Sequence, residues 1–315
     1  MLNLEAEVFA LSVAFPRVLR RITPTAPDIA ANLLRKLRSK EGSPSIWAEQ
    51  FGVLTVLYPL LQAETLQEKN RDELRQANLI HLCLLLYAFV DDRICDGQVS
   101  LNEEEVRFVE ELRSLSLNAL IQNCHDTPEF ETWMTSRQET YQKELENSYS
   151  AIGAGPTGLE RSEAFHIAST RAAYGAFAAI AVLHGNRADD ARIRIARNAY
   201  DSLVTGMQWI DDLKDWRDDL VLGDENLLLT TLRIVGAADI GALLESKCEN
   251  EVGLALYEFG VFNVAIQHAT RWLELAAHRQ VTIGCPQLAS LIRNRISDGE
   301  ALLHTIERSI TPSSC

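Results

Sequence analysis

The amino-acid sequence predicts an all-α protein, and three features of the chain lead to this prediction. Nearly every segment repeats its apolar residues at the helical spacing, and no segment alternates apolar and polar residues as a half-buried strand does. Only 9 prolines and 16 glycines occur in 315 residues, so few positions interrupt a helix. Apolar residues make up 47% of the chain, enough for a substantial core. Since no internal repeat, low-complexity tract or linker occurs, we predict one helical domain over residues 1–315.

The apolar periodicity divides the chain into consecutive helices. The first is amphipathic and contains Pro16, where we expect it to bend. The predicted helices are Leu4–Ile22, Pro27–Lys40, Ile46–Leu61, a helix from Arg71 that leads to Asp91, Glu103–Asn123, Pro128–Ser150, Ser162–His184, Ala188–Asp219, Asn226–Ile234, Asp239–Glu249, Glu251–Arg279 and Pro286–Ile310.

Capping and turn residues predict several of these boundaries. Ser45 is a candidate N-cap, and Ser100-x-x-Glu103 has the spacing of a capping box. Pro128 stands where proline is favoured, in the first turn of a helix. Gly153–Gly158 (G-A-G-P-T-G) is a loop, and no Lys-Ser/Thr follows it in the order of a phosphate-binding P-loop.

Net charge and cysteine usage exclude several classes of protein. A net charge of −14 argues against nucleic acid or an anionic membrane as the main partner. Six cysteines lie far apart without a C-x-x-C pair, as expected for reduced thiols in a cytoplasmic protein. The longest apolar run, near Leu79–Val90, is shorter than the roughly 18 residues that a transmembrane helix needs. The start of the chain also lacks the basic residues of a signal peptide.

The stretch Gln208–Asn226 carries five aspartates near the expected C-terminal end of a long helix. Three recur every four residues on one face, and two flank them: Asp211, Asp215 and Asp219, with Asp212 and Asp218 beside them. Like charges at this spacing oppose helix formation, and the helix dipole disfavours anions at this end. Lys214 and Arg217 are too few to neutralise them. The stretch is either a solvated acidic face before a glycine turn or a site of hard oxygen ligands for a divalent metal.

A second acidic cluster follows the apolar segment Ala77–Val90, which is typical of a helix buried among other helices. Asp91 and Asp92 come directly after it, and Asp96 shares a helical face with Asp92. Carboxylates at the end of a buried helix are unfavourable through both desolvation and the helix dipole. The alternative is that the helix ends here in solvent. Two such clusters, each at a helix end, favour metal binding.

The two motifs resemble those of the class I terpenoid synthase superfamily, which includes prenyl diphosphate synthases, squalene and phytoene synthases, and terpene cyclases. The first, D-D-x-x-x-D from Asp91, is one residue longer than the usual D-D-x-x-D. Read from Asp92, it is the D-x-x-x-D of squalene and phytoene synthases. The second is D-D-x-x-D from Asp211, preceded by Gln208 as in prenyl diphosphate synthases. It also fits the squalene-synthase pattern, with Asp211, Lys214, Asp215, Asp218 and Asp219 at the key places.

The resemblance implies an antiparallel helical bundle with a central cavity, in which the two clusters face each other. It implies Mg²⁺ as cofactor, three ions bound together with the diphosphate of an allylic substrate. The implied metal ligands are Asp91, Asp92, Asp96, Asp211, Asp212, Asp215, Asp218 and Asp219. We expect a class I terpene synthase, a carbon–oxygen lyase that cyclises or quenches the carbocation from a C15 or C20 prenyl diphosphate. The alternatives are a prenyltransferase and a non-catalytic homologue, and a homodimer is also compatible with the family.

Further site residues follow from the same resemblance. Terpene cyclases place a diphosphate-sensing arginine, a linker and a helix-breaking residue where Arg171, Tyr174 and Gly175 stand. A packing glycine beside a snorkelling arginine is the alternative. The expected substrate-binding residues are Tyr87, Ala88, Phe89, Phe177, Trp209 and Lys214, although most aromatic residues on helices belong to the core.

The chain departs from each branch of the superfamily. The G-G-K-x-x-R-P segment that helps chain-elongating enzymes bind isopentenyl diphosphate is absent, and Leu37-Arg38-Ser39-Lys40 is a poor substitute. Gly97-Gln98-Val99 stands in place of the Arg-Arg-Gly that follows the first motif. The N-x-x-x-S-x-x-x-E triad and the C-terminal Arg-Tyr pair of bacterial cyclases are also absent. These departures predict that ionisation is retained and leave the fate of the carbocation open.

Overall fold

The computed structural model describes residues 4–22, 27–36, 52–63, 71–95, 99–124, 128–151, 170, 172–224, 226–236 and 239–310. These residues are almost entirely α-helical and contain no strand, which confirms the predicted all-α class. Among the helices described in these ranges, none is both long and apolar enough to cross a bilayer.

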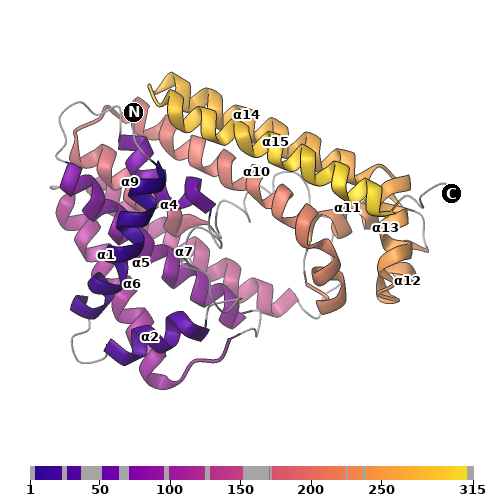
Figure 1. The fold of residues 1–315 in the computed structure, drawn as a ribbon, viewed down its shortest axis with the longest axis horizontal. Coiled ribbons are helices and arrows are strands. Elements are labelled where there is room, and N and C mark those ends of the chain that lie inside the picture. The colour runs from indigo at the N-terminus through magenta and orange to yellow at the C-terminus, as the bar shows by residue number, and fades with distance from the viewer. Residues whose placement is uncertain are drawn as a thin grey trace. The chain divides into compact units, whose positions relative to one another are not determined.

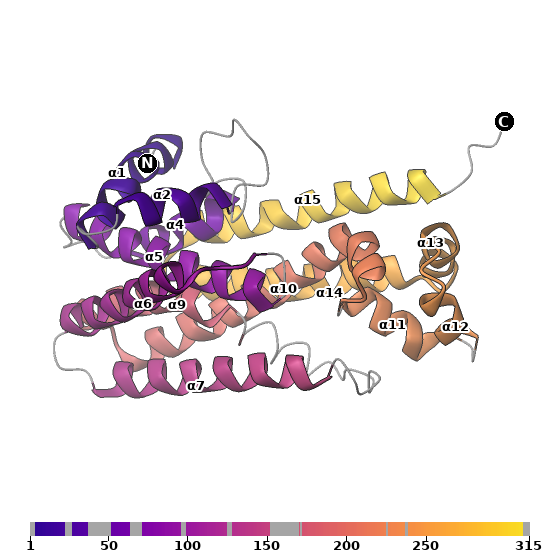
Figure 2. The same ribbon diagram turned by 90° about the horizontal axis from the view of Figure 1, so that it is seen from below.

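The helices are shown in Figures 1 and 2. They are α1 (Leu4–Ile22), α2 (Pro27–Lys36), α4 (Gly52–Ala63), α5 (Arg71–Cys95), α6 (Glu103–Asn123), α7 (Pro128–Ala151), α9 (Ala173–Gly185), α10 (Asp190–Leu222), α11 (Leu227–Val235), α12 (Ile240–Glu245), α13 (Glu249–Glu258), α14 (Val261–Thr282) and α15 (Pro286–Ile310).

The chain forms two compact units, each with its own core. Unit 1 comprises residues 1–149 and 172–197, and unit 2 comprises residues 150–171 and 198–315. Helix α10 begins in unit 1 and continues into unit 2.

Unit 1 is built around α5, which packs against α1, α4, α6 and α9. Helix α9 is buried along its whole length from Ala173 to His184, as its uniformly apolar sequence requires. Each large apolar side chain buried in this way contributes on the order of 1.5–3 kcal/mol.

Two polar side chains of α5 form hydrogen bonds with backbone groups of α4 around Pro59. Pro59 has no N–H to donate to the carbonyl of Thr55, and His81 Nε2 lies 2.8 Å from that oxygen. Because a carbonyl can only accept, Nε2 must carry the proton. Asn78 contacts the next pair of backbone groups: its Nδ2 donates to the carbonyl of Val56 at 2.6 Å, and its Oδ1 accepts from Leu60 N at 3.3 Å. The proline therefore makes α4 dependent on α5.

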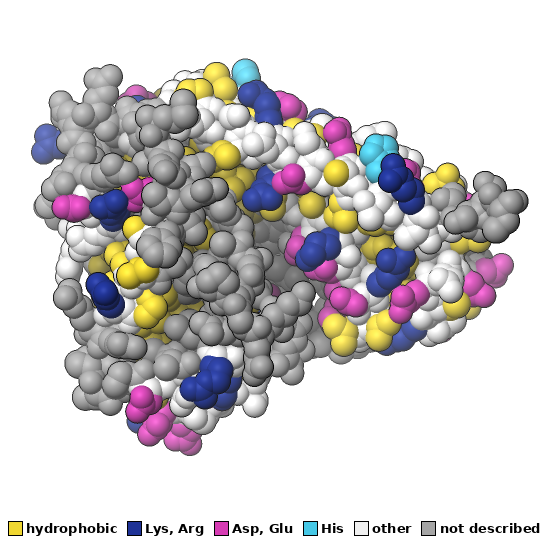
Figure 3. Space-filling model, in the orientation of Figure 1, with side chains coloured by type: hydrophobic (Ala, Val, Ile, Leu, Met, Phe, Trp, Pro, Cys, Tyr) yellow, Lys and Arg dark blue, Asp and Glu magenta, His cyan; other side chains and the backbone are white. Residues whose placement is uncertain are grey.

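Unit 2 consists of the second part of α10 with α11 to α15. Helices α14 and α15 lie side by side along their length (Figures 1 and 2). Trp216 of α10 is buried against Phe262 of α14, with ring centroids 6.1 Å apart. Gly206 lets α10 and α14 approach closely, because a Cβ at this position would lie 2.7 Å from Leu273 Cγ. On the face drawn in Figure 3, acidic and basic side chains of unit 2 are mixed with small apolar areas.

Many predicted helix boundaries lie within two residues of the observed ones, and α1, α6 and α15 have the predicted bounds. The predicted helix Asp239–Glu249 is too long, because α12 ends at Glu245 and α13 begins at Glu249. The long helix predicted for Glu251–Arg279 is wrong, because Gly260 (φ 69°) separates α13 from α14. Its left-handed conformation, which glycine adopts easily, ends the first helix. The predicted helix Ser162–His184 is not continuous through Ala172, which lies in a turn before α9. Residues 37–51 and 152–169, with Ser45 and Gly153–Gly158, lie outside the described part of the chain.

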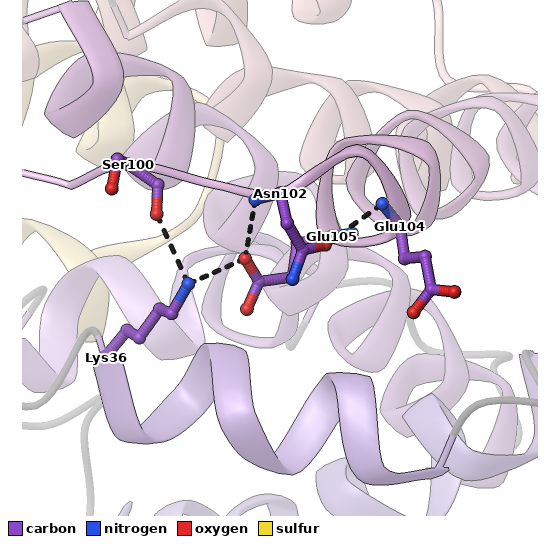
Figure 4. Close-up of polar contacts among 5 residues, drawn as sticks. All are labelled: Lys36, Ser100, Asn102, Glu104 and Glu105. Atoms are coloured by element: carbon purple, nitrogen blue, oxygen red, sulfur yellow. Dashed lines mark hydrogen bonds and ion pairs between the residues drawn. The ribbon is translucent and has the colours of Figure 1, made fainter.

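The predicted capping box at Ser100 is also wrong, since the box lies two residues later (Figure 4). Asn102 Oδ1 accepts from Glu104 N and Glu105 N at 3.0 and 2.9 Å, and Glu105 Oε2 accepts from Asn102 N at 2.9 Å. Lys36 of α2 donates to Glu105 Oε2 at 2.7 Å and to the carbonyl of Ser100 at 3.2 Å. The ion pair with Lys36 favours Glu105 as the acid of the box and joins α2 to the start of α6.

Candidate functional site

The first acidic cluster lies at the C-terminal end of α5 in unit 1. The helix continues through both adjacent aspartates, and their carboxylates have different surroundings. Asp91 is half-buried and accepts a hydrogen bond from the Tyr141 hydroxyl at 2.9 Å, whereas Asp92 is exposed. Burial raises the pKa of Asp91 more than the Tyr141 hydrogen bond lowers it. Asp96 lies outside the described residues. Asp92 therefore has the more accessible carboxylate of the described pair.

A cluster of buried rings lies directly before this end of α5. Tyr174 is at its centre, with ring centroids 5.0 Å from Tyr87, 5.1 Å from Tyr141 and 5.3 Å from Phe177, all edge-on. Burial is the main cause of the raised pKa of Tyr87, Tyr141 and Tyr174, so all three hydroxyls are neutral at pH 7. Ala88, on the helical line of Asp92, is half-buried. Tyr87 and Ala88 thus lie in different surroundings one turn before the aspartates.

Two further residues predicted to form the site lie in unit 1, and a third is not described. Phe89 is half-buried, and the Arg93 guanidinium carbon lies 4.5 Å from the centroid of its ring. Gly175 lies in the first turn of α9, where its N–H donates to the Ala172 carbonyl at 3.1 Å. Arg171 lies outside the described residues. The roles of these residues toward a substrate stay predictions.

The second acidic cluster lies in unit 2, in the last three turns of α10, which end at Gly223 (φ 84°). Asp211 and Asp218 are exposed, Asp215 and Asp219 are half-exposed, and Asp212 is buried. Asp211 has a raised pKa because protein around it removes water and because Asp215 repels it. Burial is the largest cause that raises the pKa of Asp219, to about 6, and repulsion from Asp215 adds to it. Asp211, Asp215 and Asp219 therefore lie on one face of α10, where their negative charges repel one another.

The basic and aromatic residues predicted to join this cluster have distinct surroundings. Lys214 Nζ lies 3.1 Å from Asp215 Oδ1, but both groups are solvated, so this ion pair stabilises little. Trp209 is 7% exposed, and its ring stacks on His268 of α14 with centroids 4.9 Å apart. The Trp209 ring therefore belongs to the core of unit 2 along most of its surface.

The sequence predicts Asp212 as a metal ligand and Asn226 as the first residue of a helix. The structure gives both residues hydrogen bonds that the sequence does not predict. Asp212 accepts hydrogen bonds from Gln208 Nε2 and Leu227 N, each at 2.6 Å. Asn226 is the N-cap of α11, and its Nδ2 donates to Asp219 Oδ2 at 2.7 Å. An asparagine directly before an apolar run is a recognisable N-cap signal. The contact of Tyr141 with Asp91 had no comparable signal, because it joins separate helices.

The carboxylates of α10 have the chemistry of a magnesium site. They are hard oxygen donors on an accessible face, and repulsion from Asp215 adds to the burial that raises the pKa of Asp211 and Asp219. Within the described residues, no three metal-ligating side chains converge closely enough to hold an ion alone. Helical spacing separates successive carboxylates by about 6 Å, so a multidentate anionic ligand would complete the coordination. The donor set therefore fits metal binding together with a diphosphate.

Comparisons with known proteins concern the fold. The chain matches no protein-family model and no curated protein. Octaprenyl pyrophosphate synthase from Helicobacter pylori has a similar structure, with a TM-score of 0.70 and 12% identity, over 94% of this chain and 100% of that one. Polyprenyl synthetase from Streptomyces coelicolor A3(2) gives 0.66 and 14%, over 96% and 98%.

Two further structures are similar. Geranylgeranyl pyrophosphate synthetase from Geoglobus acetivorans gives a TM-score of 0.64 and 16% identity, over 92% of this chain and 98% of that one. A polyprenyl synthase from Caulobacter crescentus CB15, complexed with calcium and isoprenyl diphosphate, gives 0.59 and 14%, over 87% and 97%. The chain therefore has the all-α fold of the prenyl diphosphate synthases, which belong to the class I terpenoid synthase superfamily.

Proposed function

We propose that this chain is a magnesium-dependent isoprenoid synthase that cleaves the carbon–oxygen bond of an allylic prenyl diphosphate and transfers the prenyl group to a second isoprenoid. The observation that carries the proposal is the acidic face of α10, where Asp211, Asp215 and Asp219 follow one another at i,i+4 spacing on a fold shared with prenyl diphosphate synthases. Like charges at this spacing oppose helix formation, and a bound cation would offset their repulsion.

The proposed metal ligands are the solvent-accessible carboxylates, which are Asp92 of the first cluster and Asp211, Asp215, Asp218 and Asp219 of the second. We further propose that Asp96 contributes to the first cluster. When bound, Mg²⁺ supplies Lewis-acid polarisation of the diphosphate oxygens and neutralises their charge. The aspartates hold and orient the complex, and the apolar helices exclude water from the allylic carbon.

Prenyl transfer takes precedence over cyclisation because the similar solved structures reported above are prenyl diphosphate synthases. The Caulobacter crescentus structure contains calcium and isoprenyl diphosphate, which is the kind of complex we propose for this chain. The substrate is proposed to be a C15 or C20 diphosphate, because the small side chain of Ala88, one turn before Asp92, would obstruct a long tail less than a bulky side chain would.

Cyclisation or quenching of the carbocation is the second candidate. It is favoured because the N-terminal part of the sequence lacks the basic segment that would bind a second diphosphate. The chain has no G-G-K-x-x-R-P segment with which to bind isopentenyl diphosphate. Lys36, the last residue of α2, is paired with Glu105 at 2.7 Å and is therefore already neutralised. A lyase needs no second diphosphate site.

The experiment that tests the proposal incubates the purified chain with C10, C15 and C20 prenyl diphosphates, with and without isopentenyl diphosphate, in Mg²⁺ or in EDTA. Longer diphosphates or head-to-head products support prenyl transfer, and hydrocarbons or alcohols from one substrate support the second candidate. If diphosphate binds only weakly and independently of metal, and nothing turns over, the chain is a non-catalytic homologue. Light scattering of the same sample tests the predicted homodimer.

A further inference from the structure

The two adjacent aspartates of the second motif have opposite surroundings. Asp211 is exposed, whereas Asp212 is 6% exposed. Both carboxylate oxygens of Asp212 accept short hydrogen bonds inside the protein: Oδ1 from Gln208 Nε2 and Oδ2 from Leu227 N, each at 2.6 Å. Successive residues of a helix point about 100° apart, so one can face solvent while the next faces the core. Both oxygens are therefore engaged within the protein, and burial keeps the rest of the carboxylate away from solvent.

Both polar atoms of the Asn226 side-chain amide form hydrogen bonds at the same junction of α10 and α11. It is 3% exposed, and its Oδ1 accepts from Leu228 N and Leu229 N at 2.9 and 3.4 Å. Its Nδ2 donates to the backbone carbonyl of Asp212 at 3.0 Å and to Asp219 Oδ2 at 2.7 Å. One side chain therefore links the start of α11, the backbone of α10 and a carboxylate of the acidic face.

These contacts complete the N-terminus of α11. The first amides of a helix have no partner within it, and three of them here are those of Leu227, Leu228 and Leu229. Asp212 takes the first and Asn226 takes the other two. A carboxylate at a helix N-terminus is also favoured by the helix dipole. This accounts for a buried aspartate without any metal ion.

We infer that Asp212 is a positioning residue and not a metal ligand: it fastens α11 to α10, and the adjoining Asn226 orients Asp219 on the acidic face. The metal-binding part of this inference rests on the proposed function, whereas the fastening of α11 rests on the hydrogen bonds alone. The second motif then divides into an outward set, Asp211, Asp215 and Asp219, and an inward residue, Asp212.

The test compares Asp212→Asn with Asp211→Asn in the full chain, by calorimetric titration of Mg²⁺ in the presence of inorganic pyrophosphate. Asp212→Asn preserves the acceptor for Leu227 N, and Gln208 can rotate its amide to accept from the new NH₂ group. We expect this variant to need nearly the same Mg²⁺ as the wild type, and Asp211→Asn to need clearly more. Equal weakening in both variants would show that Asp212 is a ligand and overturn the inference.

Asn226→Ala removes no carboxylate, yet it should weaken Mg²⁺ binding by about tenfold, because partners of metal ligands commonly have effects of this size. Unchanged Mg²⁺ binding in this variant would refute the orienting role of Asn226. Both expectations require metal binding by the wild type.

Hydrogen exchange of the amides of Leu227, Leu228 and Leu229 tests the fastening of α11 without any metal. Asp212→Ala should speed exchange at Leu227 by about tenfold, as expected when a buried donor loses its partner, while Asp212→Asn should not. Asp211→Asn is the matched control and should leave exchange unchanged. If the wild type binds neither Mg²⁺ nor pyrophosphate, the proposed function fails, and exchange still decides the role of Asp212. Unchanged exchange in Asp212→Ala would overturn it.

Discussion

Replacing Asp215 by asparagine should abolish turnover and at the same time stabilise the metal-free protein. Asp215 lies between Asp211 and Asp219 on the face of α10 and raises the pKa of both neighbours. Each like-charged i,i+4 pair opposes the helix by roughly 0.2–0.5 kcal/mol, so relieving two pairs contributes about 0.4–1 kcal/mol. The lost ion pair with Lys214 subtracts little, because both groups are solvated.

The assay is thermal unfolding of wild type and Asp215→Asn at pH 8 in EDTA and low salt, followed by unfolding in Mg²⁺ with pyrophosphate. In EDTA the variant should melt about 1–3 °C higher, given the usual relation between free energy and Tm in proteins of this size. In saturating Mg²⁺ and pyrophosphate the wild type should gain stability by mass action and the variant should gain less. High salt should reduce the difference in EDTA.

Two results would refute this reasoning. If the variant were less stable than the wild type in EDTA, the favourable contacts of Asp215 would outweigh its repulsion from Asp211 and Asp219. Near-normal turnover at saturating Mg²⁺ would mean that Asp215 is not a ligand. Asp92→Asn, at the first cluster, should likewise lose turnover and remain folded.

Three further predictions concern other positions. Burial lowers the pKa of His81 to about 4, below its unfolded value near 6.5, so the unfolded chain binds more protons and stability falls as pH drops through this window. Relative to His81→Gln, the wild type should lose about 2 kcal/mol of unfolding free energy between pH 7 and pH 5, measured by urea titration. Gly206→Ala should destabilise the protein by about 1–3 kcal/mol in the same titration, because its methyl group would meet Leu273 of α14. Ala88→Phe should suppress the longest prenyl diphosphate first when C10, C15 and C20 substrates are compared.

Matched controls separate these effects from general damage. Gly241→Ala, with no atom within 4 Å of the added Cβ, should be neutral or stabilising by up to about 1 kcal/mol. Equal losses at Gly206 and Gly241 would contradict the close approach of α10 and α14, and an unchanged substrate length preference in folded Ala88→Phe would remove that face of α5 from the substrate pocket.

The sequence predicted the helices well because their signals are local. Apolar periodicity and proline and glycine punctuation were enough for the bounds of α1, α6 and α15. The sequence could not decide between two similar capping signals, because Ser100 and Asn102 each lie three residues before a glutamate. Contact of Glu105 with Lys36, from another helix, favours Asn102 as the N-cap. Gly260 shows the same limit, because a single glycine in an apolar run predicts either a tolerated interruption or a helix end.

The candidate site was predicted as a set of aspartates, but their individual surroundings were not. Spacing along a helix placed Asp211, Asp215 and Asp219 on one face. It could not predict that Asp212 would be buried against Leu227, because that contact depends on where the chain returns after Gly223. In the same way, Tyr141 reaches Asp91 across 50 residues of chain. Such contacts are properties of tertiary structure.

The dependence of α4 on α5 has a consequence for the order in which unit 1 assembles. Around Pro59, α4 cannot satisfy its own backbone, and the missing partners are Asn78 and His81 on α5. Before α5 docks, this turn of α4 would leave the Thr55 carbonyl to water, so α4 gains little by forming early. Conversely, in a fragment that begins at α5, Asn78 and His81 would lose these backbone partners and the face of α5 that contacts α4 would be exposed to water. The two helices should therefore form and melt as one cooperative unit, with coincident hydrogen-exchange rates along both.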